Sequence, residues 1–217
     1  MREGGVAAFE AHRTHLLNIA YRMLGEMSTA EDVVQDAWLR WHGADRQSVR
    51  DDRAWLSTAT ARLALDALRR AKVRRETYVG PWLPEPVLPD DMRALTADSA
   101  VARAELASDL SLDAGRIAEL LAPDVIFHSD GGGRVPAALN SILGSDKVSR
   151  LLMGLLRKQQ AGGNVTYRPT DINGRTGLLI LVNDAVDTAV VFECDDKHIT
   201  AIHAVRNPDK LARMTGR

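Results

Sequence analysis

The stretch AEDVVQDAWLRW, residues 30–41, decides the fold of the N-terminal third of this chain. Its apolar residues recur at steps of three and four, which predicts an amphipathic helix. The apolar face is formed by Val34, Ala37, Trp38 and Trp41. On the polar side Asp32 and Asp36 project together, and Gln35 and Leu39 form a neighbouring pair.

The same helical spacing continues on both sides of this stretch. Apolar residues recur from Leu16 to Leu24 before it and from Trp55 to Leu68 after it, so we expect three helices. Ser28 with Glu31 predicts a capping box at the start of the second helix. Asp51 or Asp52 can cap the third.

Two carboxylates, an amide and a leucine in one patch suit docking on a basic protein surface. A solvated helix face is the competing interpretation, and the charges alone favour it.

The third predicted helix is strongly basic, and only Asp66 opposes its positive charges. The basic residues are Arg62, Arg69, Arg70, Lys72, Arg74 and Arg75. Such density can neutralise several phosphates, and Trp55 near the helix start can stack on a base. A solvated helix end and a tryptophan packed in the core remain the alternatives. The pattern indicates a helical domain that faces nucleic acid.

Two runs resemble extracytoplasmic-function sigma factors. Residues 30–41 resemble the polymerase-docking helix of that family, and residues 53–70 resemble its promoter −10 recognition segment. The resemblance implies that core RNA polymerase and promoter DNA are the partners. It implies contact with the β′ clamp through Asp32, Gln35, Asp36 and Leu39. The third helix and the loop 46–52 would hold the melted −10 strand, with the loop forming part of a base pocket.

The second half of the chain mixes helix and strand signals. Five prolines and glycines between Gly80 and Pro89 end the helical pattern. Residues 90–110 could be helical again, and Ile117 to Leu121 predicts a short helix before Pro123. Strands are predicted at 125–127, 165–172, 177–183, 187–194 and 198–205, with a helix over 147–157. This is an α+β pattern that ends in an antiparallel meander.

Three short motifs resemble the SigJ-type sigma factors, which carry a fused SnoaL-like domain. They are Trp82-Leu83-Pro84-Glu85-Pro86, Asp130-Gly131-Gly132-Gly133-Arg134 and Asn207-Pro208-Asp209-Lys210-Leu211. The resemblance implies two domains. An all-α sigma region-two domain over 1–79 precedes a proline-rich linker with a short helix over 80–110. A cone-shaped α+β SnoaL-like domain follows over 111–217.

The three motifs carry an expectation about regulation. We expect them to converge at the contact between the sigma and SnoaL-like parts and so to tune polymerase binding or promoter access. The alternative is that each motif serves only its own local fold.

One part of the family pattern is missing between Leu110 and Ser111. Region four, the helix-turn-helix that binds the −35 element, is expected after the linker, yet no such pattern is found there. A deletion, a natural truncation and an omitted segment remain open as explanations. A polymerase-binding regulator that cannot initiate is therefore one rival function.

The other rival is a SnoaL-type small-molecule enzyme or binding module with a helical appendage. His128 and Asp130 alternate along a predicted strand and could share a face for proton transfer. His198 and His203 should face opposite ways, so we expect no single catalytic constellation and no enzyme activity. A small-molecule ligand of this domain remains possible.

Composition excludes several classes of protein. Cys194 is the only cysteine, so no intrachain disulfide forms, and no metal site or cofactor is expected. The N-terminus lacks a signal-peptide pattern, and no apolar run could span a bilayer. We therefore expect a cytoplasmic protein without membrane contact.

Overall fold

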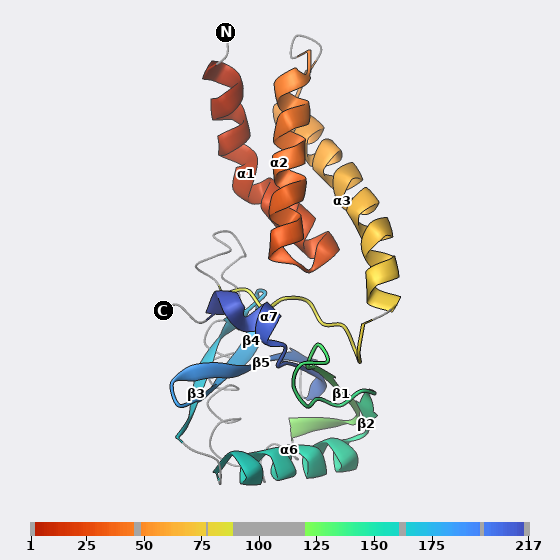
Figure 1. Ribbon diagram of the computed structural model, residues 1–217, viewed down its shortest axis with the longest axis vertical. Helices are drawn as coiled ribbons and strands as arrows, with labels where there is room; N and C mark the ends of the chain where they lie inside the picture. Colours follow the sequence, from red (N-terminus) through yellow and green to blue (C-terminus); the bar gives the residue numbers. More distant parts are fainter. Residues whose placement is uncertain are drawn as a thin grey trace. The chain divides into compact units, whose positions relative to one another are not determined.

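The computed structural model describes residues 3–45, 49–76, 78–88, 120–160, 164–195 and 198–214. Side chains are described for all of these except 3–4, 71–76 and 159–160. The described residues divide into two compact units, one ending with Glu76 and one beginning at Tyr78 (Figure 1). None of the described helices is long and apolar enough to cross a membrane.

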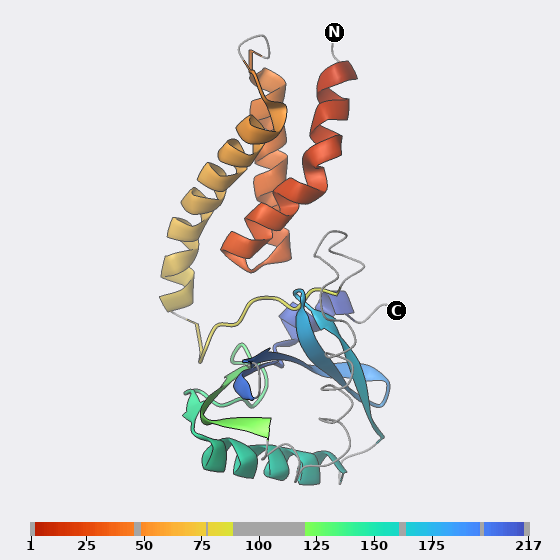
Figure 2. The same cartoon turned by 180° about the vertical axis from the view of Figure 1, so that it is seen from behind.

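The N-terminal unit consists of three helices that pack side by side (Figures 1 and 2). They are α1 (Glu3–Leu24), α2 (Met27–Gly43) and α3 (Asp52–Glu76). Buried residues follow one face of each helix, most of them three or four positions apart, as the apolar spacing predicted. The buried residues include Leu16, Ala20, Leu24, Val34, Ala37, Trp41, Leu56, Leu63 and Ala67.

The helix ends are only partly as predicted. Gly25 ends α1 at a φ of +71°, and its N–H donates to the Tyr21 carbonyl at 2.7 Å. Because α2 already begins at Met27 with Glu26 as its N-cap, Ser28 lies inside the helix and the expected capping box is wrong. Asp51 does cap α3, since its Oδ1 accepts from the Ala54 N–H at 3.0 Å.

The C-terminal unit is built on one curved six-stranded sheet in the order β2-β1-β6-β5-β4-β3. Its strands are β1 (Leu121–Asp130), β2 (Ile142–Leu143), β3 (Val165–Ile172), β4 (Arg175–Val182), β5 (Ala185–Cys194) and β6 (Ile199–Val205). Strands β3 to β6 form the predicted antiparallel meander. The sequence did not predict that β1 pairs with β6 in parallel. The fold class, a helical domain followed by an α+β domain, is confirmed.

Two local expectations on the sheet have different outcomes. Asn173 and Gly174 have φ values of +56° and +73°, which fits the predicted hairpin turn. A short helix was expected to end before Pro123. This prediction is wrong for Leu121, because β1 starts at that residue and continues through the proline.

The two faces of the sheet are covered by different parts of the unit (Figure 2). Helix α6 (Ser145–Gln160) packs on one face, where Val148 joins Phe127, Phe192 and Ile202 in a core cluster. The opposite face carries Leu83 together with residues from α7 (Pro208–Leu211) and the turn η3 (Ala212–Met214). The proline-rich segment after Tyr78 is therefore part of the C-terminal core.

Several expectations fall outside the described residues. The helix over 90–110, the start of the helix near Ile117 and the missing region four lie within residues 89–119. The domain boundaries expected at 79/80 and 110/111 stay predictions. Residues 46–48 of the expected base-pocket loop also lie outside.

Candidate functional site

The polar face of α2 is fully available for binding within the N-terminal unit. Asp32, Gln35 and Asp36 are exposed, and the Leu39 side chain is 61% exposed. An apolar side chain that remains this exposed beside two carboxylates is not needed by the helix core, which uses the opposite face.

Helix α3 carries its arginines on the outside. Arg62, Arg69 and Arg70 are exposed, and Arg69 forms an exposed ion pair with Asp66 at 3.3 Å. Such a pair contributes little to stability. The helix backbone continues past Lys72, Arg74 and Arg75, whose side chains lie outside the described part.

A pocket of about 580 Å³ lies where the loop after α2 meets α3. Arg40, Arg50 and Arg62 line it together with Trp55 and Asp51. Trp55 is half-buried and packs on Trp41 with ring centroids 5.3 Å apart. Trp55 therefore packs against the core and also lines the pocket, and its stacking on a base stays a prediction.

Sequence reasoning missed two of the three arginines in this pocket. Arg50 lies inside the loop 46–52, which was expected to form part of a base pocket. Its position in the sequence could therefore have identified it as a pocket residue. Arg40 ends the polymerase-like stretch of α2 and was not considered for DNA. Three cations around one aromatic ring suit a nucleobase flanked by phosphates.

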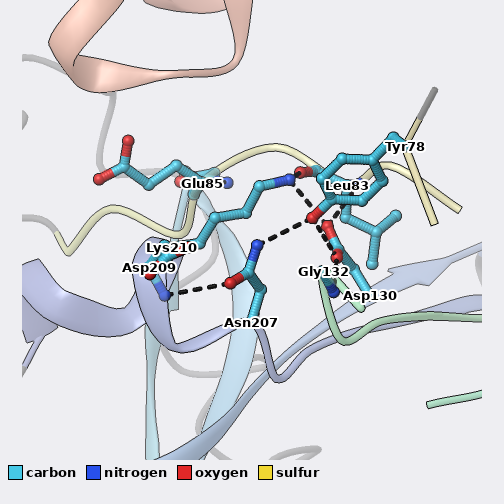
Figure 3. A network of polar contacts seen from close by, with 9 residues as sticks. Tyr78, Leu83, Glu85, Asp130, Gly132, Asn207, Asp209 and Lys210 are labelled. Atoms are coloured by element: carbon cyan, nitrogen blue, oxygen red, sulfur yellow. Dashed lines mark hydrogen bonds and ion pairs between the residues drawn. The ribbon is translucent and has the colours of Figure 1, made fainter. Parts of the chain in front are cut away.

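The C-terminal unit buries a polar cluster around Asp130, drawn in Figure 3. We call it the Asp130 cluster; its members are Tyr78, Leu83, Asp130, Gly132, Asn207 and Lys210. Asp130 Oδ1 accepts from the Tyr78 hydroxyl at 2.6 Å and the Gly132 N–H at 3.0 Å. Its Oδ2 accepts from the Leu83 N–H at 3.0 Å and Lys210 Nζ at 2.7 Å. A fully buried carboxylate is thus satisfied by four donors.

Lys210 connects the tail to the proline-rich segment. Its ammonium also donates to the Leu83 carbonyl and lies 4.3 Å from the centre of the half-buried Trp82 ring. This cation–π contact adds to the ion pair in a site with little water. The lysine side chain is 9% exposed and that of Asp130 is fully buried, so the pair lies inside the unit.

Tyr78 and Asn207 complete the Asp130 cluster. Asn207 donates from Nδ2 to the Tyr78 hydroxyl at 2.8 Å, and its Oδ1 caps α7 through the Asp209 N–H at 3.0 Å. Burial and then the bond to Asp130 raise the pKa of Tyr78 well above its ordinary range. Sequence reasoning missed Tyr78, since a single tyrosine before a proline-rich segment carries no pattern.

The glycine motif permits the close approach that this cluster needs. A Cβ on Gly132, whose φ is +61°, would lie 2.3 Å from Asn207 Nδ2. Gly133 also has a positive φ, and a Cβ on Gly131 would lie 2.3 Å from the Val135 carbonyl oxygen. Arg134 pairs with Asp209 at 3.0 Å on the surface.

The remaining motif residues divide between core and surface. Pro86 and Leu211 are buried, and the buried Glu85 lies 3.5 Å from Arg213 Nε. Pro84 and Pro208 are exposed, Pro208 in the first turn of α7. The structure therefore brings the three motifs together within the C-terminal unit.

Two of the candidate histidines, His128 and His203, lie side by side. The parallel pairing of β1 and β6 places His128 opposite His203, and their rings stack with centroids 5.2 Å apart. The sequence did not predict this pair, because the parallel pairing of β1 with β6 was not foreseen. In the part of the chain that the structure describes, no three metal-binding side chains gather.

Comparison with known proteins identifies relatives for both units. The Sigma-70 region 2 family matches residues 8–74, which is the three-helix unit. The extracytoplasmic-function RNA polymerase sigma factor SigJ of Mycobacterium tuberculosis is 39% identical over 232 residues, covering 96% of this chain and 71% of SigJ. The probable sigma factor SigI of the same organism is 44% identical over 70 residues, covering 32% of this chain and 24% of SigI.

A solved structure agrees with this result. The crystal structure of Mycobacterium tuberculosis SigJ superposes with a TM-score of 0.72 at 28% identity, covering 95% of this chain and 98% of that chain. The match extends over the helical and the α+β parts. Region 2 is the part of a sigma factor that binds core polymerase and recognises the −10 element. The chain belongs to the extracytoplasmic-function RNA polymerase sigma factors of the SigJ type.

Proposed function

We propose that this sigma factor docks on the β′ clamp of core RNA polymerase through α2 and holds the melted −10 strand in the pocket beside α3. The docking residues are Asp32, Gln35, Asp36 and Leu39. The DNA-binding residues are Trp55, Arg62, Arg69, Arg70, Lys72, Arg74 and Arg75, to which the pocket adds Arg40 and Arg50. The C-terminal unit modulates these contacts, and the protein acts in the cytoplasm as an initiation factor rather than an enzyme.

The exposed patch on α2 is the observation that carries the docking role. Leu39 is 61% exposed, and the neighbouring Asp32 and Asp36 are exposed as well. A docking face of this composition needs a basic partner with an apolar spot at its centre, where the leucine is desolvated on binding.

The pocket in the N-terminal unit supports the DNA role. Its volume of about 580 Å³ can accept a base that has left the stack. Trp55 offers a ring for stacking, while Arg50 and Arg62 supply charge for the flanking phosphates. Asp51 also lines the pocket, and as an acceptor it can contact an exocyclic amine of a base.

The modulating role rests on the Asp130 cluster. The segment that begins at Tyr78 follows α3 directly in the sequence and is held by Asp130 and Lys210. Its prolines restrict the unfolded segment, so little entropy is lost when it docks. Holding or releasing this segment changes the path of the chain that leaves the DNA-binding helix.

Binding of holoenzyme to a forked −10 promoter fragment tests the DNA role. Removing the two pocket charges with Arg50→Gln/Arg62→Gln should weaken binding by tenfold or more, since a hydrogen bond between charged groups contributes about 1.5–3 kcal/mol. Arg22→Gln, an exposed change in the last turn of α1, is the matched control and should leave binding unchanged. Equal losses in both variants would contradict the pocket assignment.

Promoter-specific transcription separates initiation from mere polymerase binding. Holoenzyme that carries this chain should produce transcripts that depend on the −10 sequence. A stable complex with core polymerase that yields no such transcripts would instead identify a polymerase-binding regulator.

A further inference from the structure

The outer side of α6 carries a row of positive charge. Figures 1 and 2 show this helix at the periphery of the C-terminal unit, along one face of the sheet. Its inner side packs on the sheet through Val148, Leu152 and Leu156. Four basic residues and one glycine on the other side are exposed, and at 3.6 residues per turn they fall within an arc of about 100°. These five residues, which we call the α6 stripe, are Lys147, Arg150, Gly154, Arg157 and Lys158.

The cations of the α6 stripe are not used in ion pairs within the described part of the unit. Asp146 is the only carboxylate of this helix, and Arg150 donates from Nε to its backbone carbonyl, at 3.1 Å, rather than to its side chain. The ion pairs among the described residues of the unit use other cations. These include Arg134, Arg175, Arg206, Lys210 and Arg213.

Helix stability explains only half of these charges. Arg157 and Lys158 lie in the last turn, where the helix dipole favours cations. Lys147 lies in the first turn, where the same dipole opposes a positive charge, and Arg150 lies in the second. The first half of the row therefore has no role in stabilising α6 and remains free for a partner.

Gly154 interrupts the row without a reason in the fold. Glycine inside a helix is unfavourable relative to almost any other residue. A Cβ at this position would meet no atom of the described residues within 4 Å, so packing does not require a glycine. A residue that weakens its own helix, and lies among cations on the surface, indicates close approach of a partner to the backbone.

The dimensions of the α6 stripe match those of a DNA groove. From Lys147 to Lys158 the helix rises by about 16 Å, at about 1.5 Å per residue. The major groove of duplex DNA is about 12 Å wide. A helix that crosses the groove can therefore reach phosphates of both strands with its two ends, while Gly154 at the middle lets the backbone come close.

We propose that the α6 stripe binds the phosphate backbone of duplex promoter DNA and gives this sigma factor a second, sequence-independent DNA contact. The proposal rests on the proposed function, because promoter DNA is the polyanion that the N-terminal unit holds. Since both units belong to one chain, DNA bound by the first is present at high effective concentration for the second, and a weak contact adds to the affinity.

Other polyanions fit the α6 stripe less well. A helix that lies on an anionic membrane needs apolar side chains free beside its basic ones, whereas Leu151, Leu152 and Leu156 of α6 pack on the sheet. An acidic protein surface would need no glycine at the centre of the row. The experiment below distinguishes a protein partner from DNA.

Binding of holoenzyme to two promoter fragments tests the proposal. One is the minimal forked −10 fragment, and the other carries the same fork with long duplex flanks on both sides. Lys147→Gln/Arg150→Gln/Arg157→Gln/Lys158→Gln should bind the flanked fragment about tenfold or more weakly, with a salt slope lower by about 0.9 per lost phosphate contact. Binding of the minimal fork, and of core polymerase without DNA, should match the parent.

The two fragments separate this proposal from the proposed function. If the N-terminal pocket does not hold DNA, Arg50→Gln/Arg62→Gln binds both fragments like the parent, while the loss from the quadruple variant stays confined to the flanked one. Equal salt slopes of the quadruple variant and the parent on the flanked fragment would overturn the α6 contact. A loss of affinity for core polymerase without DNA would also overturn it, because it would identify a protein as the partner.

Gly154→Glu tests the same surface without removing a cation. Glutamate favours a helix more than glycine does, so the midpoint of thermal unfolding should stay equal or rise. Binding of the flanked fragment should nevertheless weaken, because the side chain fills the approach to the backbone and repels phosphate. Arg168→Gln removes an exposed charge from the edge strand β3 and should match the parent on both fragments. Parental affinity of Gly154→Glu for the flanked fragment would contradict the proposal.

Discussion

The two units of this sigma factor differ in one use of charge: the C-terminal unit buries an ion pair, whereas the pair described on α3 is exposed. On α2 and on the described part of α3 most carboxylates and guanidinium groups are exposed, and Arg69 forms a surface ion pair with Asp66. In the C-terminal unit Asp130 and Lys210 meet inside the protein, where the carboxylate has no exposure at all. Exposed charges contribute little to folding and remain free for partners. A buried pair is costly to break, so it specifies one arrangement of the chain around it.

The largest expected effect comes from breaking the buried pair. Asp130→Ala should lower the free energy of unfolding of the C-terminal unit by about 3–5 kcal/mol, because Lys210 is left as an unpaired buried charge. Chemical denaturation measures it. Asp124→Ala, which removes an exposed carboxylate from the same strand, is the control.

A double variant sharpens this result. Asp130→Asn/Lys210→Met removes both charges and should recover part of the lost stability relative to Asp130→Asn alone. Strictly additive losses would show that the two side chains do not interact.

Reversal of the exposed charges on α2 should act on binding and not on folding. Asp32→Arg/Asp36→Arg should weaken the complex with core polymerase by about tenfold or more, because like charges would meet across the interface. Its stability should change by no more than about 0.5 kcal/mol. Surface binding assays with core polymerase measure the affinity. Glu10→Arg on α1 is an exposed reversal for comparison, and an unchanged affinity of the double reversal would rule out the α2 patch.

The contribution of the basic face of α3 to promoter binding should depend on the salt concentration. Neutralising Arg69, Arg70 and Lys72 should weaken promoter binding on all sequences alike and reduce the salt slope by roughly one unit per lost phosphate contact. The measurement is holoenzyme affinity for forked DNA across a salt series. Parallel slopes for the variant and the parent would exclude phosphate contacts.

The smallest expected effect concerns Asp51, a charged residue that stabilises the N-terminal unit by capping α3. Asp51→Ala removes the cap of α3 and should cost about 1 kcal/mol, measured by thermal unfolding in the absence of DNA. Asp51→Asn keeps an acceptor oxygen and should lose much less. The same loss in both variants would mean that the cap is not responsible.

Sequence patterns predicted most helices and strands, but they did not predict which of them pack or pair with each other. Helical spacing and strand alternation identified α1 to α3, α6 and the four strands of the meander, because burial imposes those periods locally. The pairing of β1 with β6 has no local signature, since a strand's period does not reveal its neighbour. Leu121 was assigned to a helix because a short apolar run fits either structure.

Prediction of the candidate sites was limited in the same way, because contacts between distant residues have no local sequence signature. The three motifs of the C-terminal unit could be selected by resemblance, whereas Tyr78 became visible only through its contacts with Asp130 and Asn207. The stacked histidines depend on the unforeseen strand pairing. Ser28 was assigned as a cap from a valid pattern, but Gly25 turns the chain earlier, so Glu26 takes that position.

The distance along the chain between Asp130 and Lys210 has a consequence for synthesis. The contacts among α1, α2 and α3 all lie within the first 76 residues, so this unit can fold as soon as its helices leave the ribosome. Asp130 can form its ion pair only after a lysine 80 residues later has been synthesised, and β1 can pair with β6 only after a similar length of chain. A nascent sigma factor thus completes the three helices of region 2 first, and the contacts of the following segment with Asp130 and Lys210 form only when translation reaches the tail.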